Sequence, residues 1–316
     1  MVFFRLYSPC LVRLGCDRSL RYPIIRQPHM ELSAYLSSNE VVLFEGAMGT
    51  QLMVRGAVMG GESNLSDPDQ VLAIHHDYVR SGCQILMTNT LTMNRVFIET
   101  HNLGIDVGEV NMAGARLARQ AIKPEGYVLG NISSTSKLLK PYGDLTEQNA
   151  IGAYAEQASI LERGEVDGFI IETMMDLKEA QLALQACREV STLPVIVTIS
   201  FKTTKKGGRT MMGNKAVDCV STLVAGGATA VGANCGDVDP WQMAEIISTM
   251  RDATDLPILA KPNAGMPRVV DRQTVYDMSV AEFQKGLRAC IEAGATLVGG
   301  CCGTTPGHIK GLAEVL

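Results

Sequence analysis

After Met30 the chain repeats one pattern eight times, a short apolar run followed by a longer segment with apolar residues three and four positions apart. We predict strands at residues 41–45, 84–89, 127–132, 168–173, 194–201, 229–235, 257–262 and 296–301, and helices at residues 68–81, 147–163, 176–190, 240–252 and 279–293. Strands that are apolar on both faces and separated by helices pair in parallel beneath those helices. Eight such units predict an α/β protein with a single domain, a (β/α)8 TIM barrel.

Helix-start signals agree with this division of the chain. Thr146 stands before one predicted helix, and Asp239-Pro240 and Thr305-Pro306 are further capping pairs. The alternative fold, a doubly wound open sheet, requires a Gly-rich nucleotide turn after the first strand. Residues 46–50 lack the glycine spacing of that turn, so we prefer the barrel.

The composition allows one large core and excludes two classes of partner. With 316 residues, of which 46% are hydrophobic and 19% charged, the chain can form a single barrel, which we assign to residues 30–316. The net charge of -5 gives no basic surface for nucleic acid. No apolar stretch reaches the roughly 18 residues that a membrane-spanning helix requires. We therefore expect neither nucleic acid nor a membrane as a partner.

Residues 1–29 differ from the rest, because five arginines stand there against one acid, Asp17. We predict an N-terminal extension outside the barrel, either disordered or lying upstream of a natural start at Met30. An Arg-rich, acid-poor segment is also typical of an organellar presequence. Nine cysteines without a short, regular spacing favour a reducing compartment over a disulfide framework. We expect a cytoplasmic protein, with organellar import as the alternative.

Enzymes with this fold carry their sites at the carboxyl ends of the strands. Polar residues and cysteines stand at the predicted strand ends: Glu45, Asn89, Asn131, Glu172, Ser200, Asn234, Cys235, Asn263, Cys301 and Cys302. Three of these residues are thiols from two strands. Three thiolates form a zinc site whose fourth position stays open for a substrate.

Cys301 and Cys302 are neighbours, and neighbouring residues of a regular strand point to opposite faces. They share a metal only where the backbone is irregular, which the flanking glycines 299, 300 and 303 permit. The alternative is a pair of small buried residues or a vicinal redox pair. The other barrel cysteines, Cys83, Cys187, Cys219 and Cys290, are predicted to fill the core, and the histidines His75, His76 and His308 to serve in packing or on the surface.

Zinc with three thiolates carries a formal charge of -1, so it activates water poorly but still deprotonates a thiol. This chemistry favours alkyl transfer to sulfur over hydrolysis. We expect the zinc-bound substrate thiolate to be the nucleophile and assign no side-chain base.

An amino-acid thiol also carries an ammonium and a carboxylate. Glu172 and Glu45 are candidates to pair with the ammonium, and the backbone N–H groups of Gly46, Ala47 and Met48 are candidates to receive the carboxylate. The alternative for both acids is a solvated loop position or a helix cap. Asn234 is a further candidate substrate contact, or it caps a turn.

The motifs GANC at 232–235 and GGCCGTTP at 299–306 resemble the zinc motifs of the homocysteine S-methyltransferase family. The segments EGAMGTQL (45–52), MTNT (87–90), DGFIIET (167–173) and KPNAGMP (261–267) look most like the branch that contains the N-terminal homocysteine-binding module of cobalamin-dependent methionine synthase. The resemblance implies a TIM barrel, zinc on Cys235, Cys301 and Cys302, and homocysteine contacts at Glu172 and residues 45–50. Two departures are Glu45, where the family usually has Asp, and Leu91, where it usually has Phe.

The methyl donor is open from the sequence. A betaine donor requires an aromatic cage, and only Phe201 and Tyr142 are expected near the mouth, with the single tryptophan at Trp241. A corrinoid donor would have to arrive on a partner protein, because the chain has no D-x-H-x-x-G motif. We expect a methyltransferase of methionine biosynthesis that uses methylcobalamin or a methylated corrinoid protein.

Several alternatives remain at this point. The donor could be S-methylmethionine or betaine, the acceptor another thiol, or the reaction a demethylation toward a corrinoid partner. The non-enzyme alternative is a zinc-storing or redox-sensing protein.

Overall fold

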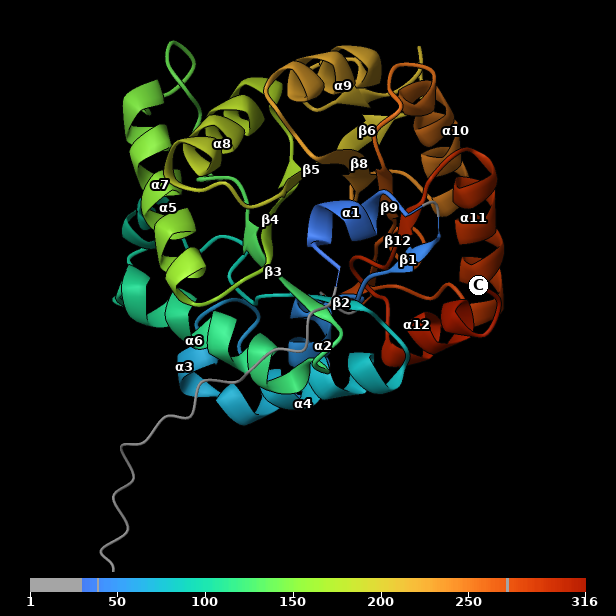
Figure 1. Cartoon of the computed structure of the whole chain (residues 1–316), viewed down its shortest axis with the longest axis horizontal. Helices are drawn as coiled ribbons and strands as arrows, with labels where there is room; N and C mark the ends of the chain where they lie inside the picture. The colour runs from blue at the N-terminus through green and yellow to red at the C-terminus, as the bar shows by residue number, and fades with distance from the viewer. Residues whose placement is uncertain (1–29, 39, 271–272) are drawn as a thin grey trace, which may run out of the picture.

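The computed structural model describes residues 30–38, 40–270 and 273–316, so the predicted extension at 1–29 lies outside the described residues. Eight parallel strands form one sheet in the order β1-β12-β9-β8-β5-β4-β3-β2 (Figure 1). Their bounds are β1 Val42–Leu43, β2 Ile85–Met87, β3 Tyr127–Ile132, β4 Gly168–Met174, β5 Val195–Ile199, β8 Ala230–Asn234, β9 Ile258–Lys261 and β12 Leu297–Val298.

The first and last strands of this order meet where Phe44 pairs with Ile85. Two backbone hydrogen bonds complete the seam, from Gln84 N to Leu43 O at 2.8 Å and from Glu45 N to Ile85 O at 3.1 Å. The sheet is therefore a nearly closed barrel, and the predicted TIM-barrel fold is confirmed.

Helices alternate with the strands and form the outer layer (Figure 1). The longer ones are α4 Pro68–Arg80, α6 Val107–Ala121, α7 Glu147–Arg163, α8 Leu177–Val190, α9 Ala216–Ala225, α10 Pro240–Arg251, α11 Val280–Glu292 and α12 Pro306–Ala313. Shorter helices, α2 Gly49–Val54, α3 Ser63–Ser66 and α5 Arg95–Thr100, follow the first two strands. Thr146 and Asp239 cap α7 and α10 with their side chains, as predicted. None of the described helices is long and apolar enough to cross a membrane.

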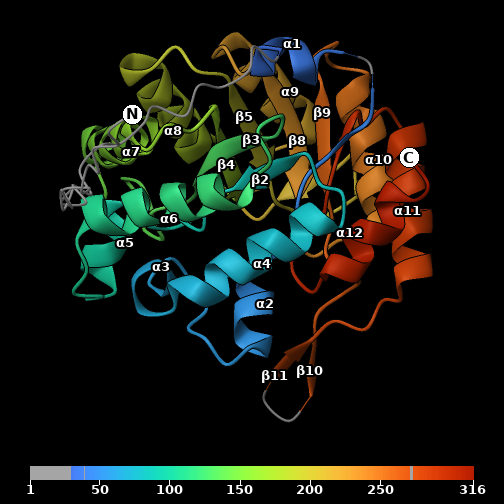
Figure 2. The same ribbon diagram turned by 60° about the horizontal axis from the view of Figure 1, so that its bottom comes forward.

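A short helix that the sequence did not indicate, α1 Leu32–Leu36, closes the amino end of the barrel. Leu32 and Leu36 pack against the inward-facing apolar residues of the strands, among them Val42, Phe44, Leu129, Ile170, Ile196, Leu259 and Leu297. A Cβ atom on Gly168 would lie 2.8 Å from Leu32 Cδ2, so the strand lies close against this helix. Figure 2 shows α1 at one end of the molecule and a hairpin at the other.

That hairpin, β10 Arg268–Val270 with β11 Gln273–Val275, and a second one, β6 Phe201–Thr203 with β7 Arg209–Thr210, were not predicted. Both lie in loops that follow barrel strands. The predicted strand at 194–201 ends at Ile199 within the barrel, because Phe201 belongs to the second hairpin. The predicted strand at 296–301 ends at Val298, because the chain turns through glycines before the cysteines.

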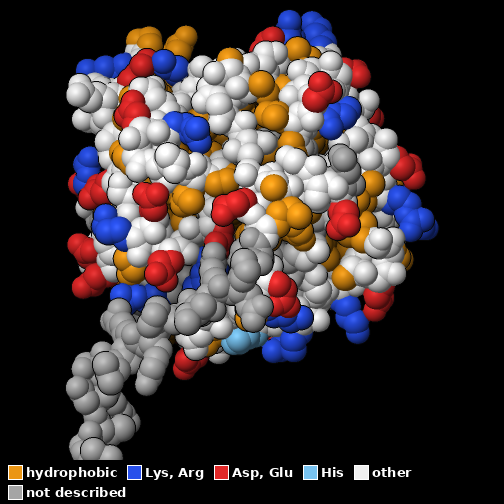
Figure 3. All heavy atoms as spheres, viewed as in Figure 1, with side chains coloured by type: hydrophobic (Ala, Val, Ile, Leu, Met, Phe, Trp, Pro, Cys, Tyr) orange, Lys and Arg blue, Asp and Glu red, His pale blue; other side chains and the backbone are white. Residues whose placement is uncertain are grey.

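On the face seen in Figure 3, acidic and basic side chains of the described residues are interspersed.

Candidate functional site

The inward-facing positions of the strands change from apolar to polar toward the carboxyl end of the barrel. Side chains two residues apart on a strand share a face. In three strands an inward apolar residue is followed two positions later by a polar one: Leu129 by Asn131, Ile170 by Glu172 and Leu259 by Lys261. These polar side chains line one pocket of about 390 Å³, which we call the mouth pocket.

Glu172 is the centre of a buried polar network in the mouth pocket. Its Oε1 lies 2.6 Å from Lys261 Nζ, and its Oε2 accepts a hydrogen bond from Asn131 Nδ2 at 3.1 Å. Lys261 is 1% exposed and Glu172 5% exposed. A charge so deeply buried is normally paired, and here the two charges neutralise each other. We predicted no role for Lys261 from the sequence, although its place two residues after the inward Leu259 indicates an inward side chain.

Three thiols lie beside this network. Cys235 directly follows β8, and Cys301 and Cys302 follow β12 in a turn. Their three sulfur atoms lie within 4.8 Å of one another, and the Sγ atoms of Cys235 and Cys302 are 4.0 Å apart. Tetrahedral zinc with Zn–S bonds of about 2.3 Å would separate its sulfur ligands by about 3.8 Å. The cluster therefore fits a metal of this type.

Irregular backbone brings the sulfurs together, as the sequence required. Cys235 has a φ of 54°, in a left-handed region that residues other than glycine rarely occupy. Gly303 has a φ of +79°, and a Cβ atom there would lie 2.2 Å from Tyr276 Cβ. The backbone is thus strained next to the thiols, where strain of this kind often accompanies function.

Asn234, the last residue of β8, contacts the thiol of Cys301 and is itself fixed by hydrogen bonds. Its Oδ1 accepts hydrogen bonds from Thr173 N at 2.9 Å and from Thr198 Oγ1 at 2.7 Å. Its Nδ2 donates to Thr173 Oγ1 at 2.7 Å and lies 3.7 Å from Cys301 Sγ. A side-chain amide has two donors and an oxygen with two lone pairs, so all of its hydrogen-bonding capacity is used within the fold.

The turn at Gly46, Ala47 and Met48 is tied to the thiol loop through Thr304. The hydroxyl of Thr304 accepts from Ala47 N at 2.9 Å and donates to Cys301 O at 2.7 Å. A Cβ atom on Gly46 would lie 2.7 Å from that hydroxyl oxygen, so the close approach requires glycine. All three turn residues line the mouth pocket together with the cysteines.

Glu45 lines the same pocket, but both of its carboxylate oxygens already have partners. Oε1 accepts a hydrogen bond from Met87 N at 2.9 Å, and Oε2 lies 3.1 Å from His75 Nδ1. The preceding residue, Phe44, belongs to the inward core, so Glu45 is directed toward α4, which carries His75. His75 is fully buried, so of the packing and surface positions predicted for it, the structure gives an interior one.

Burial and mutual hydrogen bonds keep the metal-free thiols protonated. A hydrogen bond with Cys235 and burial raise the pKa of Cys302 to about 12. A hydrogen bond with Cys301 and burial raise the pKa of Cys235 above its ordinary value. A metal ion would therefore have to displace protons from the cluster. By contrast, Cys83, Cys187, Cys219 and Cys290 are buried among apolar side chains and fill the core, as predicted.

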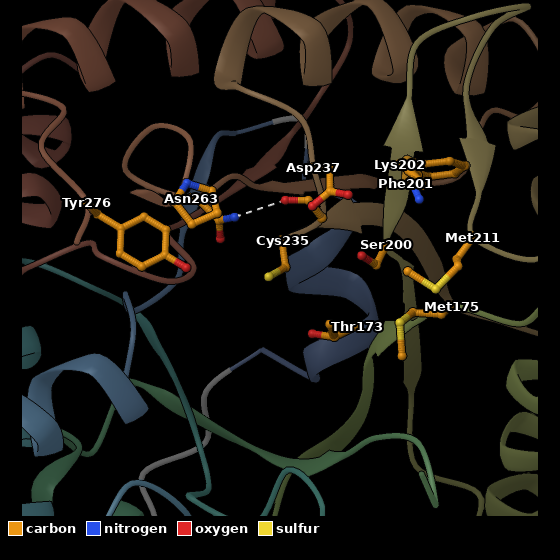
Figure 4. Close-up of a pocket in the computed structure, with 12 residues that line it drawn as sticks. Thr173, Met175, Ser200, Phe201, Lys202, Met211, Cys235, Asp237, Asn263 and Tyr276 are labelled. Atoms are coloured by element: carbon orange, nitrogen blue, oxygen red, sulfur yellow. Dashed lines mark hydrogen bonds between the residues drawn. The ribbon is translucent and has the colours of Figure 1, made fainter. Parts of the chain in front are cut away.

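A second pocket, of about 250 Å³, lies on the other side of Cys235, and we call it the hairpin pocket. Figure 4 shows Cys235 between Thr173 and Tyr276, with Met175 and Met211 on the opposite wall. Phe201 and Tyr276 are its two aromatic residues. Tyr276 was not among the residues predicted for the site, because it directly follows β11 and only the fold of this loop brings it here. The other aromatic residues that we considered, Tyr142 and Trp241, line neither pocket and are 79% and 42% exposed.

The predicted ring of polar residues is thus divided among three places. The residues Glu45, Asn89, Asn131 and Glu172 line the mouth pocket. Ser200 and Asn263 line the hairpin pocket, and Asn234 contacts the thiol of Cys301.

Comparison with known proteins gives a consistent result. A family model described as Homocysteine S-methyltransferase matches residues 42–316. The chain is 29% identical over 301 residues to the methionine synthase of Mycobacterium tuberculosis, covering 88% of the chain and 25% of that protein. It is equally similar to the methionine synthase of Mycobacterium leprae, of which it covers 24%. The chain therefore spans about a quarter of the length of these relatives.

The metallated form of the homocysteine methyltransferase MmuM from Escherichia coli has a similar fold. It aligns with a TM-score of 0.73 and 20% identity over 91% of this chain and 100% of that chain.

Proposed function

The chain belongs to the homocysteine S-methyltransferase family, and from this premise we propose that it methylates the sulfur of homocysteine to give methionine. The family match confirms the methyltransferase class that the motifs indicated, and it favours an enzyme over the zinc-storing or redox-sensing alternative. The observation that carries the proposal is the cluster of three thiols beside a pocket that also holds ionic side chains.

Cys235, Cys301 and Cys302 would hold the metal, and zinc suits their three sulfur ligands best. When bound, zinc acts as a Lewis acid that keeps a substrate thiol in its thiolate form near neutral pH. Asn234 and Thr304 position the ligands, since each contacts Cys301 directly. No side chain is assigned as a general base.

The mouth pocket supplies complementary groups for the amino-acid part of homocysteine. Backbone N–H groups of the turn at Gly46 and Met48 are the proposed site for the carboxylate, because Ala47 N is already bonded to Thr304. Glu172 is the proposed counterion of the ammonium. Glu45 is a weaker candidate, because both of its oxygens are held by Met87 and His75.

For the donor we propose a methylated corrinoid protein that acts in trans, and methylcobalamin as its minimal substitute. The similar proteins named methionine synthase support this choice. Exposed apolar side chains that line the two pockets, Leu91, Met175 and Met211, offer a surface for a large partner. Small cationic donors such as S-methylmethionine or betaine are the alternative, since the hairpin pocket holds Phe201 and Tyr276.

Methionine formation from homocysteine tests the proposal. The zinc-loaded protein should produce methionine with one of three donors: methylcobalamin, S-methylmethionine or betaine. We expect methylcobalamin to be used best. A protein that transfers a methyl group from none of these donors to homocysteine or to any other thiol would contradict the proposed function.

A further inference from the structure

Asn131 has a side chain whose orientation is fixed by its neighbours. Its Nδ2 donates to Glu172 Oε2 at 3.1 Å, and a carboxylate paired with an ammonium group can only accept. The amide therefore faces Glu172 with its nitrogen, and its oxygen must face elsewhere. The backbone is fixed as well, because Asn131 N donates to Thr88 Oγ1 at 2.9 Å and Asn131 O accepts from Thr90 Oγ1 at 2.7 Å.

The amide oxygen that results from this orientation is a buried acceptor without a partner. Asn131 is 6% exposed, it lines the mouth pocket, and its Oδ1 makes no hydrogen bond within the protein. Native proteins rarely leave such an atom unpaired, so a water molecule or a bound ligand normally completes its hydrogen bonding. A ligand that satisfies it must bring an N–H or O–H donor.

The charges around Asn131 narrow the choice of ligand group. A carboxylate carries only acceptors and would face both Asn131 Oδ1 and Glu172 Oε2 unfavourably. A thiol belongs at the three cysteines, which line the same pocket. An ammonium offers three N–H donors and a positive charge. Glu172 can attract that charge and accept a further hydrogen bond, since each of its carboxylate oxygens has two lone pairs. Lys261 already balances the charge of Glu172, so recognition of the ammonium also needs a directed acceptor.

We propose that Asn131 is a specificity-determining residue, whose Oδ1 accepts a hydrogen bond from the α-ammonium of the thiol substrate. It selects amino-acid thiols over thiols of the same length that lack the amino group. This inference rests on the proposed function and adds to it a residue to which the sequence motifs gave no role.

Calorimetric titration of the zinc-loaded protein with two thiols provides the test. The thiols are homocysteine and 4-mercaptobutanoate, which has the same chain without the amino group. Asn131→Leu should weaken homocysteine binding by about 10- to 100-fold, the range expected for one hydrogen bond to a charged group. It should change the affinity for 4-mercaptobutanoate by no more than about twofold. Asn131→Gln, which keeps both the amide donor and the acceptor oxygen, should retain a preference for homocysteine.

Asn263→Leu is the matched control, because Asn263 is also buried and also has an unpartnered Oδ1, but lines the hairpin pocket. It should leave the ratio of the two affinities unchanged.

Two results would overturn the inference alone. They are an equal loss of both affinities in Asn131→Leu, or no loss of homocysteine affinity in that variant. A wild-type protein that binds neither thiol would instead refute the proposed function, and this inference with it.

Discussion

The two ends of the barrel interior are built from the same strands and differ in one layer of side chains. At the amino end, Leu259 and its inward neighbours pack against α1 and form a closed apolar core. Two residues further along β9, Lys261 faces the same interior but pairs with Glu172 beside three thiols. A step of two residues along a strand therefore leads from the part of the barrel that stabilises the fold to the part proposed to carry the chemistry. Substitutions at the two ends should affect different properties.

The largest contrast is expected between cysteines of the site and of the core. Cys301→Ala should abolish zinc binding at this site and lower methyl transfer by about a thousandfold or more, because the metal contributes several kcal/mol to such reactions. Cys290→Ala, in the apolar core, should retain zinc and cost about 1 kcal/mol of stability. Metal analysis, turnover and urea unfolding of both variants provide the comparison. A Cys301→Ala protein with normal zinc content would show that the metal lies elsewhere.

The pH dependence of zinc binding should show how many thiols of the site lose a proton when the metal binds. The pKa of Cys302 is raised to about 12, and the pKa values of Cys235 and Cys301 are raised as well. The metal-free cluster is therefore protonated at neutral pH. Zinc must then release about three protons, and its affinity should fall by up to about a thousandfold for each unit by which the pH is lowered. An indicator dye in weak buffer measures the protons directly. Release of one proton or none would contradict a three-thiolate site.

Lys261→Met should be the most destabilising single change in the polar layer. It leaves Glu172 buried without a cation, for which a cost of about 3–5 kcal/mol is expected. The double variant Lys261→Met with Glu172→Gln should recover part of this stability, because the unpaired charge is removed. Urea unfolding of the single and double variants measures the effect. Equal stability of the wild type and the single variant would show that the pair is solvated in solution.

At the amino end, Leu36→Ala should cost about 2–3 kcal/mol of stability, toward the lower end of the range for buried leucines, since a short helix can adjust. Zinc stoichiometry and the affinity for homocysteine should stay unchanged. A loss of zinc in this variant would mean that the two ends of the barrel are coupled.

The sequence predicted the barrel well, because each apolar run and each helical period is a local signal. The cluster of three thiols was also predictable, since glycines frame the Cys301–Cys302 pair and a third thiol stands at the end of another predicted strand. Lys261 was missed, because one cation at the end of an apolar run looks like the solvated end of a strand. Only the alternation Leu259 to Lys261, combined with a closed barrel, shows that it points inward.

Other parts of the site depend on contacts that local patterns do not specify. Tyr276 directly follows the β10–β11 hairpin and lines the hairpin pocket together with Cys235, and such short strands leave no clear periodicity in the sequence. Asn234 is fully bonded to Thr173, Thr198 and Cys301, partners that are distant in sequence. The role of Glu45 likewise depends on His75, which only the packing of α4 brings into contact.

The central claim is that three cysteines hold one zinc ion whose free position takes the sulfur of homocysteine. X-ray absorption spectroscopy at the zinc edge, before and after homocysteine is added, tests it most directly. We predict one zinc per chain with three sulfur ligands, and a fourth sulfur once homocysteine binds. Protein that holds no zinc, or zinc whose sulfur coordination does not change with homocysteine, would contradict the account.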